Sequence, residues 1–295
     1  MLIFLGFRLF AFFVRSLPQR WGQVLACRLG GLIYRVSPMA EAARDNFRHV
    51  LGPSAGPHVV SRTAQKAFEQ RTLNYFEMIS LSSGTLDHID WRSKIHGLDD
   101  LEAIIAERRG VIIAAGHLGP MEYMMQGITT LPFEMIGIQE RLKNERVHDY
   151  LIGLRSAHGF EMLSTQGPLL GVYRRVKRGA VLLTAVDRDS TGTGLITEFF
   201  GAPAWVPDGY ARLAVRAGVP VVFGYPWRTP DGAECQVFPP IYPDLSLSKE
   251  EAVRDVVNRT LQRLEQAIRA HPREWHLSTP IWRLAQEKLA VGADQ

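Results

Sequence analysis

Beyond Gly84, short continuous apolar runs alternate with stretches in which apolar residues recur at helical spacing. A strand inside a parallel sheet has such a continuous run because helices cover both of its faces. The alternation therefore predicts an α/β domain, with a mixed and largely parallel sheet that is flanked by helices. The four runs are VIIAAG, FEMIGI, AVLLTAV and VPVVFGY, at residues 111–116, 133–138, 180–186 and 219–225.

The helices that flank this sheet are predicted from the stretches between the runs, where apolar residues follow a helical period. They cover residues 119–130, 145–159, 167–178, 208–218 and 248–270. Two further helical pieces precede the first run, at residues 38–51 and 59–81, and the Gly- and Pro-rich segment GPSAGPH separates them. The chain has no internal repeat and no clear linker after residue 40, so we expect one domain over residues 38–295.

The first 37 residues combine many apolar side chains with five arginines, and they contain no Asp or Glu. The apolar run over residues 1–14 includes Arg8 and is shorter than the ~20 residues that a spanning helix needs. We therefore expect one or two membrane-associating helices over residues 1–37. Their apolar side chains would enter the acyl boundary while the arginines contact anionic headgroups. One alternative is a pair of ordinary core helices that is rich in arginine. Another is a mitochondrial transit peptide, which is also rich in arginine and poor in acids but, unlike this segment, rich in serine.

Charge and cysteine usage narrow the possible partners. The formal net charge of +4 is confined to the N-terminal segment, so we expect no nucleic-acid partner. Cys27 and Cys235 form no C-x-x-C pair, which argues against a disulfide framework or a zinc ribbon and favours a reducing compartment. The histidines include no H-E-x-x-H pattern, and we predict no metal site.

The segment VIIAAGHLGPMEYMM places His117 at the carboxyl end of a predicted strand. Ligands of open α/β sheets bind at these strand ends. Gly119 and Pro120 predict an N-cap and the first helical turn, which would let Glu122 fold back toward the imidazole. A carboxylate on one ring nitrogen would fix the tautomer, so that the other nitrogen can accept a proton from a hydroxyl. The alternative is that His117 caps the helix and Glu122 is a solvated first-turn acid.

A second cluster, DRDSTGTGLITEFFG, directly follows the strand at residues 180–186. Asp187 and Asp189 would again lie at a carboxyl end of the sheet. One interpretation is the aspartyl nucleophile motif D-x-D-x-T of a phosphatase, and a second is a calcium loop without the usual flanking helices. A third is a substrate-binding loop in which Arg188 contacts a phosphate.

Taken together, these residues resemble the lysophospholipid acyltransferase superfamily over nearly the whole chain. More narrowly, they are similar to its branch of lipid A late acyltransferases and mycobacterial phosphatidylinositol mannoside acyltransferases. The segments that carry the resemblance are ARDNFRHVLG, GLDDLEAIIAERRGVIIAAGHLGPMEY with its H-x-x-x-x-E, DRDSTGTG with EFFG, and HPREWHLSTPIW. The ending HLSTPIW lacks the Arg- and Lys-rich finish of the lipid A enzymes, and RDSTGTG looks closer to the phosphatidylinositol mannoside group.

The resemblance implies a glycerol-phosphate-acyltransferase-like fold and roles for particular residues. His117 and Glu122 would be the catalytic pair, and Arg155 would lie near the thioester or an acceptor phosphate. The wall of the site would be formed by Asp187, Arg188 and the turn Phe199, Phe200 and Gly201.

The resemblance also implies an activity. We expect transfer of a fatty acyl group from acyl-CoA or acyl carrier protein to a hydroxyl of a membrane glycolipid or phospholipid, at the cytoplasmic face of the cell membrane. A thioester donor is already activated, so no cofactor is expected. Two alternatives stay open, a D-x-D-dependent phosphatase that uses Asp187 and a non-catalytic protein that binds membrane lipids.

Overall fold

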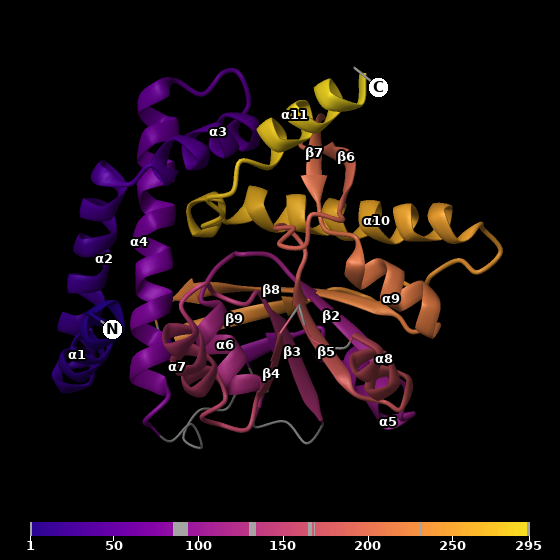
Figure 1. The fold of residues 1–295 in the computed structure, drawn as a ribbon, viewed down its shortest axis with the longest axis horizontal. Coiled ribbons are helices and arrows are strands. Elements are labelled where there is room, and N and C mark those ends of the chain that lie inside the picture. The colour runs from indigo at the N-terminus through magenta and orange to yellow at the C-terminus, as the bar shows by residue number, and fades with distance from the viewer. Residues whose placement is uncertain are drawn as a thin grey trace.

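The computed structural model describes residues 2–84, 94–129, 134–164, 167, 169–230 and 232–293. In these residues, a seven-stranded sheet with the order β1-β9-β8-β2-β5-β3-β4 forms the centre of the molecule (Figure 1). All neighbouring strands are parallel except β8 and β9, which are antiparallel. The predicted fold class, a mixed and largely parallel sheet flanked by helices, is confirmed.

The strands of this sheet include the four that the apolar runs predict. Their bounds are β1 Ile95–His96, β2 Val111–Ala115, β3 Met135–Gln139, β4 Glu161–Ser164, β5 Val181–Ala185, β8 Val221–Thr229 and β9 Gly232–Val237. The first predicted residue of the second run, at position 133, lies outside the described residues. A separate antiparallel hairpin consists of β6 Leu195–Phe199 and β7 Ala202–Val206. The runs do not predict β1, β4, β6, β7 or β9 because these strands carry polar or exposed side chains.

Helices flank and connect the strands. Their bounds are α3 Met39–Leu51, α4 Pro57–Leu81, α5 Leu98–Ala106, α6 Met121–Ile128, α7 Glu145–Arg155, α8 Leu169–Lys177, α9 Gly209–Ala217, α10 Lys249–Ala270 and α11 Ile281–Ala293. Helices α3, α4, α6, α7, α8, α9 and α10 lie at the predicted places, whereas α5 was not predicted. The long α10 begins with a capping box, in which Ser248 and Glu251 exchange side-chain and backbone hydrogen bonds. Helix α11 follows Pro280 and was not predicted.

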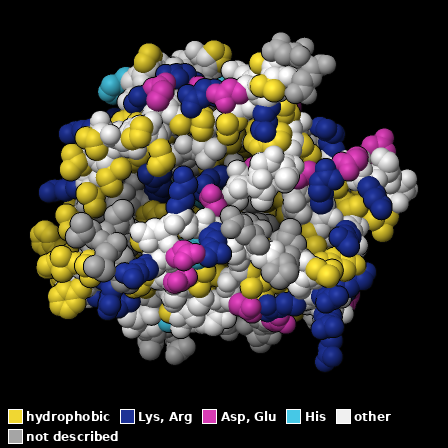
Figure 2. Space-filling view, viewed as in Figure 1, with side chains coloured by type: hydrophobic (Ala, Val, Ile, Leu, Met, Phe, Trp, Pro, Cys, Tyr) yellow, Lys and Arg dark blue, Asp and Glu magenta, His cyan; other side chains and the backbone are white. Residues whose placement is uncertain are grey.

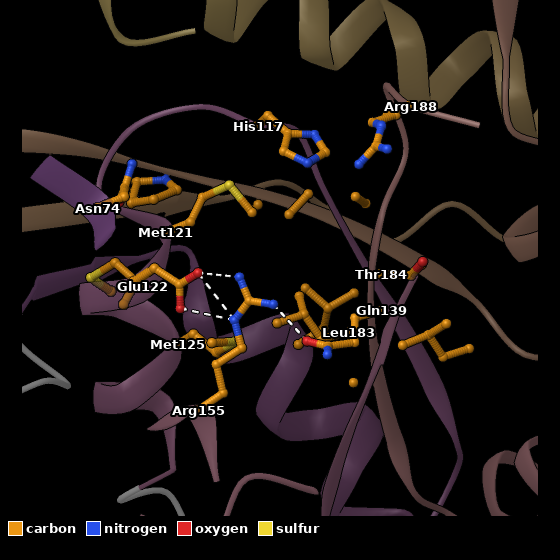
Figure 3. Close-up of a pocket in the computed structure, with 18 of the residues that line it drawn as sticks. Asn74, His117, Met121, Glu122, Met125, Gln139, Arg155, Leu183, Thr184 and Arg188 are labelled. Atoms are coloured by element: carbon orange, nitrogen blue, oxygen red, sulfur yellow. Dashed lines mark hydrogen bonds and ion pairs between the residues drawn. The ribbon is translucent and has the colours of Figure 1, made fainter. Parts of the chain in front are cut away.

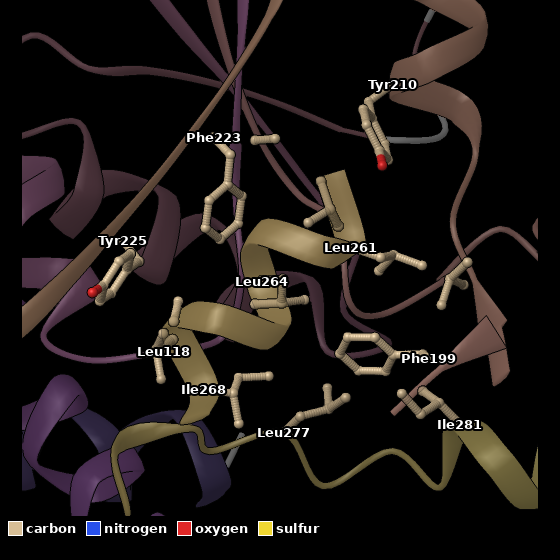
Figure 4. Close-up of a cluster of buried hydrophobic side chains, with 14 of the residues drawn as sticks. Leu118, Phe199, Tyr210, Phe223, Tyr225, Leu261, Leu264, Ile268, Leu277 and Ile281 are labelled. Atoms are coloured by element: carbon tan, nitrogen blue, oxygen red, sulfur yellow. The ribbon is translucent and has the colours of Figure 1, made fainter. Parts of the chain in front are cut away.

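The two faces of the sheet are buried in different hydrophobic clusters. Because side chains alternate along a strand, Ile112 of β2 enters one cluster and Ile113 enters the other. Helix α10 crosses the first face, where Leu261 and Leu264 lie close to Phe223 of β8 (Figure 4). Helices α5 and α6 contribute to the cluster on the second face.

Two N-terminal helices, α1 Leu2–Ser16 and α2 Gln19–Val36, pack against α4. The approach of α2 is close, since a Cβ atom at Gly30 would lie 2.6 Å from the Cα of Glu69. Figure 2 shows hydrophobic side chains gathered on this side of the molecule, with basic side chains among them. None of the helices in the described ranges is both long and apolar enough to cross a membrane.

Candidate active site

The strand order brings His117 and Asp187 together at the carboxyl edge of the sheet. Strands β2 and β5 are parallel neighbours whose last residues, Ala115 and Ala185, are in register. His117 and Asp187 each follow two residues after this pair. The backbone N–H of Val186 extends the pairing by donating to the carbonyl of Ala115 at 2.9 Å. The two side chains therefore leave the sheet at the same level and face each other.

Asp187 holds the imidazole of His117 through its ring and its backbone. The Oδ1 atom of Asp187 lies 2.6 Å from Nδ1 of His117, and Oδ2 accepts from the His117 backbone N–H at 2.7 Å. The indole of Trp275 donates to the same Oδ2 at 2.9 Å. When the ring is neutral, this contact pattern fixes Nδ1 as the protonated nitrogen and leaves Nε2 for a substrate.

Asp187 is 0% exposed, whereas the side chain of His117 is 28% exposed and lines a cavity. Burial by itself raises the pKa of the Asp187 carboxyl, but the adjacent His117 charge and the three hydrogen bonds lower it below its ordinary value. Asp187 is therefore an ionised, buried carboxylate beside a ring that solvent reaches.

The predicted contact between Glu122 and the imidazole is wrong. Helix α6 begins at Met121 rather than at the predicted residue 119, and its first turn directs Glu122 toward α7. There the carboxylate accepts from Nε of Arg155 at 3.1 and 3.2 Å and from its Nη2 atom. Figure 3 shows Glu122 turned toward Arg155, with His117 on another side of the cavity. At 7% exposed, Glu122 is not a solvated acid either.

Arg155 connects this ion pair to the end of β3. Its Nη1 atom donates to Oε1 of Gln139 at 2.6 Å. Burial by itself lowers the pKa of Arg155, but the charge of Glu122 and its hydrogen bonds raise the pKa above the ordinary value. The predicted site residue Arg155 thus lies at the cavity as a permanently charged group with a carboxylate partner.

A loop from the C-terminal part of the chain packs against the segment that carries His117. The backbone N–H of His276 donates to the His117 carbonyl at 2.8 Å, and the Gly119 N–H donates to the Glu274 carbonyl at 3.0 Å. Gly119 has φ +67°, and a Cβ there would lie 2.0 Å from the carbonyl oxygen of Pro226. Only glycine therefore fits at position 119, between the carbonyl of Pro226 and the C-terminal loop.

His276 lies edge-on to the imidazole of His117, with ring centroids 6.0 Å apart. The amide nitrogen of Asn74 is 3.0 Å from the Gly119 carbonyl, which must accept, and 3.1 Å from Nε2 of His276. This network assigns the ring proton of His276 to Nδ1. Burial, followed by the charge of His117, lowers the pKa of His276 to about 3, so the ring is neutral.

The depressed pKa predicts acid sensitivity of the fold. Unfolding returns His276 to its ordinary pKa of 6.5, so protonation of the unfolded chain lowers the free energy of unfolding as pH falls below that value. Between pH 6.5 and about pH 5, this single group is expected to lower the free energy of unfolding by roughly 2 kcal/mol. Chemical denaturation across this range should show a flatter pH dependence for His276→Gln than for the wild type. If the stability of both proteins depends equally on pH, the low pKa of His276 is contradicted.

A cavity of about 560 Å³ opens beside His117. Several of its apolar lining residues belong to the cluster on the second face of the sheet, to which α5 and α6 contribute. Polar and charged lining residues include Arg71, Asn74, His117, Glu122, Arg155 and Arg188. The apolar interior includes Leu98, Leu101, Ile113, Met124, Phe160 and Val222. A volume of this size is typical of a site that encloses a small molecule or a lipid chain.

The remaining predicted wall residues separate into two groups. Arg188 lines the cavity and pairs with Glu140 at 2.5 Å. Phe199 ends β6, Phe200 and Gly201 form the turn to β7, and none of the three is among the residues that line the cavity. Phe199 is buried instead in the core, where its ring stacks on Trp282 at 5.6 Å.

The second aspartate of the DRD segment organises its own loop. Asp189 accepts from the backbone N–H groups of Thr191 and Gly194 at 2.8 and 3.0 Å and from the Trp205 indole at 2.8 Å. Since Asp187 is fully buried against His117 and Trp275, it is not accessible as a phosphatase nucleophile. These contacts disfavour the phosphatase alternative.

Sequence reasoning missed three residues that support His117. Trp275 and His276 come from the segment HPREWHLSTPIW, which was noticed only for its resemblance to other sequences. Asn74 is an ordinary polar residue within a long helix. Trp275 and His276 could have been identified because they lie in a connecting segment after a helix, where functional residues are common.

Comparisons with known proteins agree on one family. A family model described as "Bacterial lipid A biosynthesis acyltransferase" matches residues 1–284. The phosphatidylinositol mannoside acyltransferase of Mycobacterium tuberculosis (strain CDC 1551 / Oshkosh) is 29% identical over 252 residues, which are 82% of this chain and 77% of that protein. The protein of the same name from Mycolicibacterium smegmatis is 25% identical over 287 residues, which are 91% of this chain and 88% of that one.

Among solved structures, the 1-acyl-sn-glycerophosphate acyltransferase PlsC from Thermotoga maritima aligns with 86% of this chain and 99% of its own. The TM-score is 0.37 and the sequence identity is 17%.

Proposed function

Because the chain belongs to the bacterial lipid A biosynthesis acyltransferase family, we propose that it transfers a fatty acyl group from acyl-CoA or acyl carrier protein to a hydroxyl of a membrane glycolipid or phospholipid. The observation that carries this proposal is the pair of His117 and buried Asp187 at a largely apolar cavity. The relatives named as phosphatidylinositol mannoside acyltransferases favour a glycosylated phospholipid as the acceptor.

His117 is the general base of this reaction. Its Nε2 takes the proton of the acceptor hydroxyl, and the hydroxyl oxygen attacks the thioester carbonyl to form an oxyanion. The oxyanion collapses, the carbon–sulfur bond breaks, and the departing thiolate receives the proton from the imidazolium. Asp187 stabilises that imidazolium and holds the ring in the required tautomer. Glu122 takes a different role from the predicted one and fixes Arg155 at the cavity.

The apolar interior of the cavity is the proposed binding site for the acyl chain. Ile113 points into it from β2, two residues before Ala115 and thus farther from His117 along the strand. Ile113→Phe is expected to shift donor preference toward shorter chains by filling this space, and Ile113→Ala to shift it toward longer ones. The measurement is kcat/KM for a series of acyl-CoA chain lengths.

Ile112→Ala is the matched control, because Ile112 faces the opposite cluster and its loss should leave the chain-length preference unchanged. If Ile113→Phe and Ile113→Ala both keep the wild-type preference, the acyl chain binds elsewhere.

We propose that the N-terminal helices attach the protein to the cytoplasmic face of the cell membrane. Large apolar side chains of α1 and α2 are exposed, including Leu9, Phe12, Phe13, Trp21 and Leu25. Arginines on the same helices, with no acidic residue among them, suit anionic headgroups. An active site beside such a surface can receive a lipid acceptor without removing its chains from the bilayer.

The experiment that tests the function is acyl transfer by the purified protein. Isotope-labelled acyl-CoA or acyl carrier protein is incubated with glycosylated and plain phospholipids in vesicles, and lipid products are identified by mass spectrometry. We expect a new ester on one lipid class that His117→Ala does not form. If the folded wild-type protein forms no ester from either donor but still binds lipid, the non-catalytic alternative is favoured.

A further inference from the structure

Three arginines line the cavity, and only two of them have carboxylate partners. Arg155 pairs with Glu122, and Arg188 pairs with Glu140. Among the residues that the structure describes, no carboxylate forms an ion pair with the third, Arg71 of α4. A charged group that loses water without gaining a counter-ion is costly, so an unpaired arginine in a cavity wall points to an anionic ligand.

The surroundings of Arg71 hold its guanidinium in place without neutralising it. Nη1 donates to Oγ of Ser278 at 3.1 Å and lies 3.9 Å from the sulfur of Met39. The guanidinium carbon stacks 4.6 Å from the ring centroid of Phe68. Burial lowers the pKa of Arg71, which agrees with a desolvated cation whose remaining donors face the cavity.

The neighbours of Arg71 add further unsatisfied polar groups on the same wall. Ser278 uses an oxygen lone pair to accept from Arg71, so its hydroxyl proton is free to donate to a ligand. One helical turn along α4, the buried Oδ1 atom of Asn74 has no hydrogen-bond partner within the described chain. Arg71, Asn74 and Ser278 all line the cavity that contains His117.

We propose that Arg71 and Ser278 form a phosphate-binding subsite in the wall of this cavity. A guanidinium matches the geometry of a phosphate group and can bind two of its oxygens at once. The identity of the ligand rests on the proposed function, in which both substrates carry phosphate: a phospholipid acceptor carries one in its headgroup, and the thioester donor carries one on its pantetheine arm. The subsite positions the phosphate-bearing substrate relative to Nε2 of His117.

Steady-state kinetics of Arg71→Gln and Arg71→Lys test the proposal. The acceptor arm compares a glycosylated phosphatidylinositol with a glycosyl diacylglycerol that lacks phosphate. The donor arm compares acyl-CoA with an acyl N-acetylcysteamine thioester, which also lacks phosphate. Arg71→Gln should raise the KM of the phosphate-bearing member of one pair by about ten-fold or more, with kcat nearly unchanged. The KM of its phosphate-free counterpart should not change.

The pair that responds identifies which substrate supplies the phosphate. Arg71→Lys should give a smaller rise, because lysine keeps the charge but not the planar fork. Arg62→Gln is the matched control, since Arg62 is exposed on the same helix and its loss removes the same charge. If Arg71→Gln does not fold, the same KM comparison is made with Arg71→Lys. The inference is overturned if folded Arg71 variants have the same KM as Arg62→Gln for all four substrates.

A binding measurement separates this inference from the proposed function. Isothermal titration calorimetry uses dihexanoyl-phosphatidylinositol and coenzyme A as soluble phosphate-bearing probes and needs no acyl transfer. If the wild-type protein is catalytically inactive, the proposed function fails, but weaker binding of either probe by Arg71→Gln than by Arg62→Gln still supports the subsite. Equal binding of both probes by these two variants excludes it.

Discussion

Replacing Asp187 with asparagine is expected to lower kcat for acyl transfer by about 10³–10⁴-fold, with little change in KM. The asparagine amide cannot stabilise an imidazolium, and its NH₂ group facing Nδ1 would favour the opposite tautomer of His117. Nε2 would then carry the proton and could not accept one from the acceptor hydroxyl. Initial rates at saturating acyl-CoA, together with a thermal melt that shows a folded variant, provide the measurement.

Glu122→Gln is the comparison that decides which carboxylate serves the imidazole. This substitution removes the charge beside Arg155 and leaves a buried guanidinium without its partner, so we expect lower stability. In the fraction that folds, the loss in kcat should be much smaller than for Asp187→Asn. The assignment of Asp187 fails if Glu122→Gln abolishes turnover while Asp187→Asn retains it.

Replacing His117 with glutamine is expected to cost about 10²–10⁴-fold in kcat, the usual contribution of a general base. Glutamine can keep a hydrogen bond to Asp187 but cannot take a proton at neutral pH. Single-turnover experiments with preformed complexes of donor and enzyme isolate the chemical step from product release. We expect the chemical step to slow while donor binding stays near the wild-type level.

The double variant of His117→Gln and Asp187→Asn gives an independent check of this pairing. If Asp187 acts through the imidazole, the combined loss should be close to that of the single His117 variant rather than the product of both losses. Multiplicative losses would show that the two residues act separately. Wild-type turnover in His117→Gln would exclude the imidazole as the base.

The layered architecture could be predicted from local sequence, but the partner of His117 could not. Continuous apolar runs identify β2 and β5 because burial on both faces demands such residues. The order of strands in the sheet depends on contacts between distant segments, which no local pattern records. Once β2 and β5 are known to be neighbours, Asp187 follows as the residue that faces His117.

The spacing of His117 and Glu122 was misleading for a related reason. A separation of five residues across a loop and a helix start allows either direction for the second side chain. The position of α7 decides the direction, because Arg155 offers Glu122 a charged partner inside the protein. Likewise, Phe199 was expected at the site, but its ring packs in the core on Trp282 of the unpredicted α11.

The contacts of Trp275 and His276 with the segment that carries His117 have a consequence for biosynthesis. A ribosome finishes β2 and β5 well before it reaches these two residues, so a growing chain lacks the indole and backbone donors that complete the pair. If His117 is the base of the proposed acyl transfer, the unfinished polypeptide is expected to be inactive. Proteolytic cleavage between α10 and Trp275 would leave this segment held only by its packing and its hydrogen bonds.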